Sequence, residues 1–105
     1  MPTKQYRELK DFLLQHYPIC ECCGIGPGVE LHHCIEKRRK GRKELDVIMN
    51  LEVACHQCHM SGKLDSSEHA IEFARKRIEE GYDVLGWYDG LTLITRRFPN
   101  LRGLL

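Results

Sequence analysis

The sequence predicts a small α+β domain in which two short β-strands lie between an N-terminal and a C-terminal helix. The length of 105 residues is that of one domain. Two Cys-x-x-Cys pairs, Cys20/Cys23 and Cys55/Cys58, enclose two short apolar segments. Amphipathic helical patterns stand on both sides of these pairs. We therefore expect a single domain over residues 1–105.

The first helix is expected over residues 3–17. Thr3 is a candidate N-cap, and Pro18 stops the pattern. Apolar side chains recur at helical spacing at Tyr6, Leu9, Phe12, Leu13 and Tyr17. The first cysteine pair and a glycine-rich loop follow.

Two short strands are expected next. Residues 29–35 are β-prone and end close to the pair His32-His33, and residues 36–46 read as a polar loop. Within residues 47–54, apolar Leu51 and Val53 alternate with polar positions, which suits a strand returning beside the first. Residues 56–64 can begin a helix.

The C-terminal part carries the clearest helix pattern, over residues 67–80. Ser66 or Ser67 can cap its start, and Gly81 stands where a helix ends. Its expected buried stripe is Ala70, Ile71, Ala74 and Ile78. Beyond it, residues 84–88 and 91–95 flank Asp89-Gly90, which is typical of a hairpin, but residues 84–88 also fit one turn of amphipathic helix.

The cysteines indicate metal binding in a reducing compartment. The N-terminus has no apolar signal region and no segment is long enough to cross a membrane, so we expect a cytoplasmic, intracellular protein. Paired Cys-x-x-Cys turns then favour a four-cysteine zinc site over a disulfide framework. Cys22 and Cys34 remain, and we expect small buried apolar side chains there, although Cys22 could replace Cys23 as a ligand.

The charge is unevenly distributed, although the net charge is only +1. Six of the seven residues in 37–43 are basic, and they follow the histidine pair. Such a cluster can neutralise nucleic-acid phosphates, or can simply be a solvated loop. The candidate nucleic-acid-binding residues are Lys37, Arg38, Arg39, Lys40, Arg42 and Lys43.

The order of the first cysteine pair, His32-His33 with Ile35, Asn50, the second cysteine pair and then His59 resembles the HNH endonuclease family, in the subgroup with a four-cysteine zinc site. The resemblance covers residues 20–62, and residues 63–105 form a C-terminal helical extension without a transferable motif. It departs from the family pattern at Cys34, where an aliphatic residue is more usual, and in the strongly basic loop after the histidine pair.

The resemblance implies a ββα-metal core and a role for each matching residue. His32 and His59 would bind a catalytic divalent ion, and His33 would be the general base that deprotonates water. Asn50 would brace the loop holding His33, although this position binds metal in some members. The first two assignments suit elementary chemistry, since an ordinary imidazole has a pKa of about 6.5 and adjacent strand residues face opposite ways. We expect His56 and His69 to be surface or structural residues, and His16 to pack from the N-terminal helix.

The expected function is therefore metal-dependent hydrolysis of DNA phosphodiester bonds, leaving 5′-phosphate and 3′-hydroxyl ends. Mg²⁺ or Mn²⁺ is the expected catalytic ion, with Ni²⁺ or Zn²⁺ as alternatives because the ligands are nitrogen-rich. One alternative is a non-catalytic zinc module that binds nucleic acid or protein. Another is a nuclease subunit that is active only within a larger phage or restriction assembly, in which case it would act in a host cell.

Overall fold

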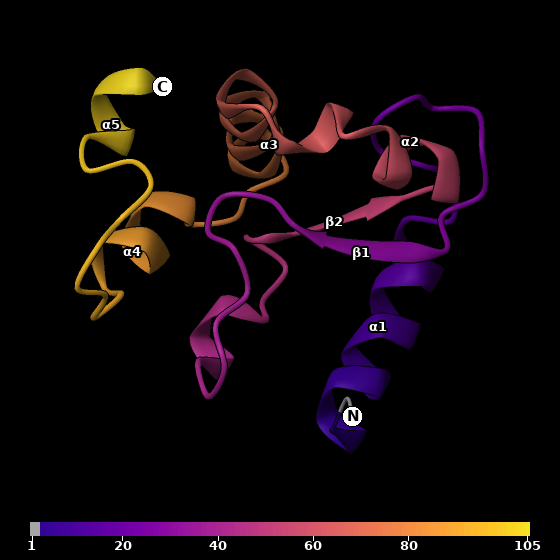
Figure 1. Cartoon of the computed structure of the whole chain (residues 1–105), viewed down its shortest axis with the longest axis horizontal. Coiled ribbons are helices and arrows are strands. Elements are labelled where there is room, and N and C mark those ends of the chain that lie inside the picture. Colours follow the sequence, from indigo (N-terminus) through magenta and orange to yellow (C-terminus); the bar gives the residue numbers. More distant parts are fainter. Residues whose placement is uncertain (1–2) are drawn as a thin grey trace.

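The computed structural model describes residues 3–105 and has a two-stranded antiparallel sheet with helices on both faces (Figure 1). Strand β1 spans Glu30–His33 and β2 spans Leu51–Ala54, with His32 opposite Glu52 and His33 opposite Leu51. Both strands lie inside the segments expected from the sequence. The predicted small α+β fold is confirmed at this level.

Helix α1, Lys4–His16, covers one face of the sheet. The Thr3 side chain caps it by accepting a hydrogen bond from the backbone N–H of Tyr6 at 3.1 Å. The fully buried Leu13 packs against Leu51 and Val53 of β2. This apolar contact holds the helix against the sheet.

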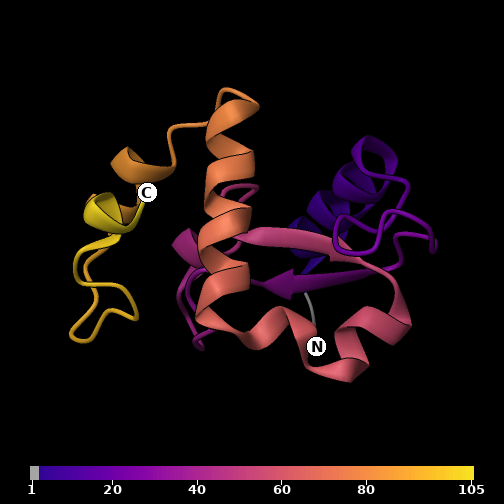
Figure 2. The ribbon, with the colours of Figure 1, turned by 90° about the horizontal axis from the view of Figure 1, so that it is seen from above.

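The other face carries α2, His56–Ser61, then the 3₁₀ turn η2, Lys63–Asp65, and α3, Ser67–Glu79. Figure 2 shows α3 lying across the end of the sheet where β1 finishes and β2 begins. Ser66 caps α3 by accepting from the N–H of His69 at 3.0 Å. The 3₁₀ turn η1, Lys43–Leu45, lies within the loop that joins the strands.

The buried face of α3 differs from the expected stripe. Ile78 is 38% exposed, whereas Phe73 and Arg77 are buried beside Ala70 and Ala74. The expectation is confirmed at Ala70 and Ala74 and is wrong at Ile78. It considered apolar residues alone, whereas charged and carbonyl partners hold Arg77 inside.

The C-terminal segment resolves the ambiguity at residues 84–95 in favour of a helix. Helix α4, Val84–Asp89, is capped by the Asp83 carboxylate, which accepts from the N–H of Gly86 at 2.9 Å. A short helix α5, Leu101–Leu104, follows. The largest apolar core packs around Tyr88 and also contains Cys34, Ile35, Leu45, Phe73, Val84, Phe98 and Leu101.

The fully buried Arg77 connects three parts of the chain. Its guanidinium contacts both oxygens of the Glu21 carboxylate at 2.6 and 2.8 Å, and donates to the carbonyls of Ile48 and Leu51 at 2.9 and 3.0 Å. Burial by itself would raise the pKa of Glu21, but the hydrogen bonds and the charge of Arg77 outweigh it and lower that pKa.

No helix within residues 3–105 has the length and apolar character needed to cross a bilayer.

Replacing Arg77 by Leu should strongly destabilise the fold. The change leaves the Glu21 carboxylate buried without its main partner, and breaking such a pair costs about 3–5 kcal/mol. Urea unfolding followed by circular dichroism measures the effect. The matched control is Arg75→Leu, an exposed position on the same helix, which should change the stability by about 0.5 kcal/mol or less. Equal effects of the two substitutions would contradict a special role of the Arg77 pair.

Candidate functional site

The four cysteines of the two Cys-x-x-Cys pairs come together as the sequence predicts. The sulfur atoms of Cys20, Cys23, Cys55 and Cys58, here called the four-cysteine cluster, all lie within 4.8 Å of one another. The Cys23 and Cys55 sulfurs are 4.0 Å apart. Four thiolates bound tetrahedrally to zinc at about 2.3 Å would be separated by about 3.8 Å. The cluster could therefore hold a structural zinc ion.

Backbone N–H groups in the two cysteine turns are directed at cysteine sulfurs. The N–H of Gly26 points at the sulfur of Cys23 at 3.4 Å, and the N–H of Cys58 points at that of Cys55 at 3.5 Å. The N–H groups of Gly26 and Ile25 lower the pKa of Cys23 to about 6. Since the thiolate is the form that binds zinc, the first cysteine turn favours metal binding at Cys23.

Glycine at position 26 lets the two cysteine turns approach each other. A Cβ atom on Gly26 would lie 2.9 Å from the Cβ of Cys55 and 3.1 Å from its sulfur, closer than the packed structure allows.

The remaining cysteines differ from each other: Cys34 is fully buried in the main core, as expected, whereas Cys22 is only half-buried and packs against the four-cysteine cluster.

The three histidines singled out by the sequence line one open surface pocket of about 290 Å³. His32 and His33 come from β1, and His59 comes from α2, which begins within the second cysteine pair. The rings of His32 and His59 lie 5.4 Å apart between centroids. The basic residues Lys37 and Arg38 line the same pocket.

One nitrogen of each ring in this histidine pocket has a hydrogen-bond partner. His32 Nε2 contacts the carbonyl of Leu64 at 3.2 Å, and His59 Nδ1 contacts a Glu30 oxygen at 2.5 Å. Metal-binding histidines usually donate their second N–H to a carbonyl or carboxylate in this way. Burial lowers the pKa of His32, which favours the neutral ring that binds metals. Among the described residues, the second ring nitrogen of His32 and of His59 has no hydrogen-bond partner.

His33 has a different partner. Its Nε2 lies 2.7 Å from the Oδ1 atom of Asp46, in the loop that joins the strands. A carboxylate in this position orients an imidazole. Among the described residues, Nδ1 of His33 has no hydrogen-bond partner.

Asn50 is fully buried and holds the chain that follows β1. Its Oδ1 accepts from the N–H groups of Ile35 and Glu36 at 2.8 and 2.9 Å. Its Nδ2 donates to the carbonyls of Glu36 and Leu45, both at 2.9 Å. These contacts fix the loop after His33. They engage both the oxygen and the nitrogen of the Asn50 amide with backbone groups, which does not suit a metal ligand.

The basic residues of the loop fall into two groups. The Arg39 and Arg42 guanidinium groups donate to the carbonyls of Thr95 and Thr92, both at 2.9 Å, and so tie the loop to the C-terminal segment. The exposed members are Lys37, Arg38, Lys40 and Lys43.

Two carboxylates beside the histidines were not expected from the sequence. Strand alternation places Glu30 on the same face as His32, so its position could have been noticed. Hydrogen bonds to His59 and, next, to His56 lower the pKa of Glu30. The His56 Nδ1 atom lies 2.5 Å from the second Glu30 oxygen. No sequence pattern identifies Asp46 in the same way, because it reaches His33 through the path of the loop that joins the strands.

Comparisons of the chain with protein-family models, with curated proteins and with solved structures found no match. The fold and the site define a small α+β protein with a four-cysteine cluster that could bind zinc.

Replacing a cysteine of the four-cysteine cluster by Ser should remove a tightly held zinc ion and unfold much of the domain. Zinc binding by such sites is coupled to folding, with apparent free energies of about 10–16 kcal/mol in small zinc peptides. Elemental analysis and circular dichroism of chelator-washed protein measure both effects. Cys22→Ser is the control and should keep the ion. A washed parent protein that is folded and zinc-free would refute the structural role.

Proposed function

We propose that the chain is a metal-dependent DNA endonuclease of the HNH type, with β1, β2 and α2 as its ββα-metal core. The observation that carries this proposal is the convergence of His32, His33 and His59 in one open pocket next to exposed basic residues. Each histidine has a partner that suits a distinct role. The motif order in residues 20–62 supports the same assignment.

His33 is the proposed general base. It takes a proton from the attacking water on one ring nitrogen, while Asp46 contacts the other nitrogen at 2.7 Å. The carboxylate keeps the ring oriented. Asn50 positions the loop after His33 through its four hydrogen bonds.

His32 and His59 are the proposed ligands of the catalytic ion. When bound, Mg²⁺ or Mn²⁺ would stabilise negative charge on the scissile phosphate and on the leaving 3′ oxygen. The two imidazoles also suit Ni²⁺ or Zn²⁺. Glu30 orients His59, and the Leu64 carbonyl orients His32.

The exposed basic residues are the proposed contacts to the DNA backbone. Lys37 and Arg38 line the pocket itself, so they can hold a phosphate beside the histidines. Arg39 and Arg42 contribute through the loop's shape, because their guanidinium groups bind the C-terminal segment. Hydrolysis would leave 5′-phosphate and 3′-hydroxyl ends.

His33→Ala should remove activity in a way that added metal does not restore, because it deletes the proton acceptor. General-base catalysis contributes typically ~100- to 10,000-fold in rate. His32→Ala and His59→Ala should lose activity through weaker metal binding, so higher Mg²⁺ or Mn²⁺ should restore part of it. Plasmid nicking rates over a metal titration, together with calorimetry, measure the difference.

The control for these variants is His16→Ala, a helix α1 residue that lies outside the pocket lining. Equal metal rescue of His33→Ala and His59→Ala would show that His33 is a ligand. An inactive parent protein that still binds DNA would instead indicate a non-catalytic zinc module. Activity that appears only with added partner proteins would indicate a subunit of a larger assembly.

Neutralising Lys37 and Arg38 together by Gln should weaken DNA binding and its salt dependence. Each lost phosphate contact lowers the slope of log affinity against log salt by about 0.9 on duplex DNA. Fluorescence anisotropy with labelled duplex at several salt concentrations measures the slope. The matched control, Lys10→Gln with Arg75→Gln, makes the same charge change away from the pocket. An unchanged slope in the Lys37/Arg38 variant would show that the pair is merely solvated.

A further inference from the structure

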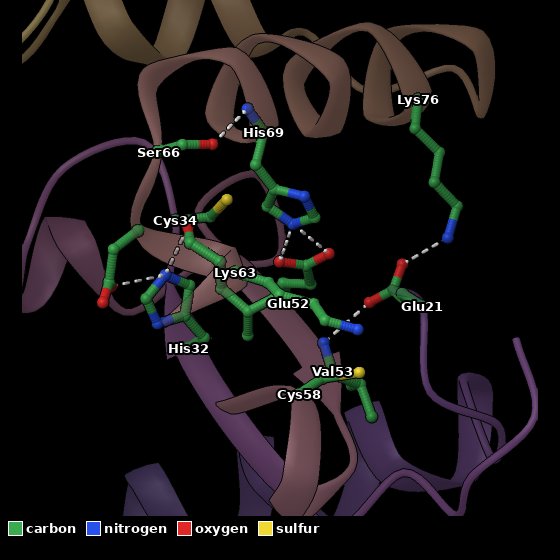
Figure 3. A network of polar contacts seen from close by, with 12 residues as sticks. Glu21, His32, Cys34, Glu52, Val53, Cys58, Lys63, Ser66, His69 and Lys76 are labelled. Atoms are coloured by element: carbon green, nitrogen blue, oxygen red, sulfur yellow. Dashed lines mark hydrogen bonds and ion pairs between the residues drawn. The ribbon is translucent and has the colours of Figure 1, made fainter. Parts of the chain in front are cut away.

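Cys34, Glu52 and His69 form a second group of metal-binding residue types, here called the Cys-Glu-His cluster, and the proposed endonuclease reaction uses none of them. One ligand atom from each residue lies within 4.8 Å of the other two. Cys34 directly follows β1, Glu52 belongs to β2, and His69 lies in the first turn of α3. Figure 3 shows the three side chains turned toward one another.

The centre of this cluster is a buried carboxylate. Glu52 is 2% exposed and Cys34 is fully buried. Within residues 3–105, the Glu52 carboxylate contacts His69 Nε2 through both oxygens, at 2.7 and 2.9 Å. A buried carboxylate is costly unless it is paired or binds a metal, so this position needs a cation of some kind. A protonated His69 supplies one, and a metal ion can take its place.

The cluster is reachable from solvent on one side. A surface cavity of about 470 Å³ is lined by Glu52 and His69 together with Cys22, Lys63 and other side chains. Cys34 closes the inner side, within the main core. An ion bound here would thus have three protein ligands and one position open toward the cavity.

We propose that the Cys-Glu-His cluster binds a zinc-class transition-metal ion, separately from the four-cysteine cluster and from the histidine pocket. One sulfur, one oxygen and one nitrogen are ligands typical of Zn²⁺, whereas Mg²⁺ and Ca²⁺ select oxygen. Ligands at about 2.0–2.3 Å from a tetrahedral ion are separated by about 3.5 Å. Glu52 and His69 would therefore move apart by less than about 1 Å, which a partly exposed His69 can accommodate.

The test counts zinc ions in a background that lacks one ligand of the proposed catalytic site. Chelator-washed His59→Ala protein should retain one zinc ion in the four-cysteine cluster and take up a second on titration with ZnCl₂. Native mass spectrometry gives the count and calorimetry gives the affinity. Adding His69→Gln or Cys34→Ala should abolish the second uptake and leave the first ion in place. Adding His16→Gln, the matched control, should leave both ions bound.

A second measurement needs no substitution within the Cys-Glu-His cluster. Co²⁺ added to the zinc-retaining His59→Ala protein should produce a sulfur-to-cobalt charge-transfer band, because Cys34 would be a ligand. Absence of both the band and the second zinc ion would overturn the proposal and leave Glu52 and His69 as an ion pair. Undiminished uptake by Cys34→Ala and His69→Gln would overturn it as well, by placing the ion elsewhere. Neither result bears on nuclease activity, so the two proposals fail independently.

Discussion

The buried contact between Arg77 and Glu21 connects the parts of this small domain. Glu21 lies within the first cysteine turn, and its carboxylate also accepts the backbone N–H of Val53 in β2 at 2.7 Å. Arg77 brings α3 to that carboxylate and donates to the carbonyl of Ile48, in the loop before β2, and to that of Leu51, the first residue of β2. The ring of Tyr17 lies 4.3 Å from the guanidinium and joins the end of α1 to the same place. A domain of this size has a limited apolar core, so a satisfied polar junction matters for keeping one arrangement of its elements.

The four-cysteine cluster places the histidine pocket. Its second Cys-x-x-Cys turn is also the beginning of α2, so the position of the cysteines determines where His59 lies. The first turn leads into β1 and the histidine pair. Pairing β1 with β2 then brings Glu30 beside α2, where it contacts His59. The histidine pocket therefore depends on long-range contacts at both ends of a short hairpin, whose two strands have four residues each.

The two faces of the sheet divide the polar chemistry of the molecule. His32, Glu52 and Glu30 alternate on the face covered by α2 and α3, and each meets a partner from those helices or from the turn between them. His33 and Leu51 belong to the face covered by α1, where His33 reaches Asp46. Adjacent histidines on one strand thus receive different electrostatic surroundings. This difference is what makes separate roles as metal ligand and as base physically reasonable.

The sequence by itself determined the features that depend on local spacing. The helix cap at Thr3, a serine cap at the start of α3, the two strands and the two Cys-x-x-Cys turns follow from short-range patterns. Only the tertiary structure decided that α3 buries Arg77 rather than Ile78, that residues 84–89 are helical, and that Asp46 and Glu30 contact His33 and His59. The physical reason is that hydrogen bonds and ion pairs such as Glu21–Arg77 join residues far apart along the chain. Their formation depends on how the elements pack, and no local periodicity records it.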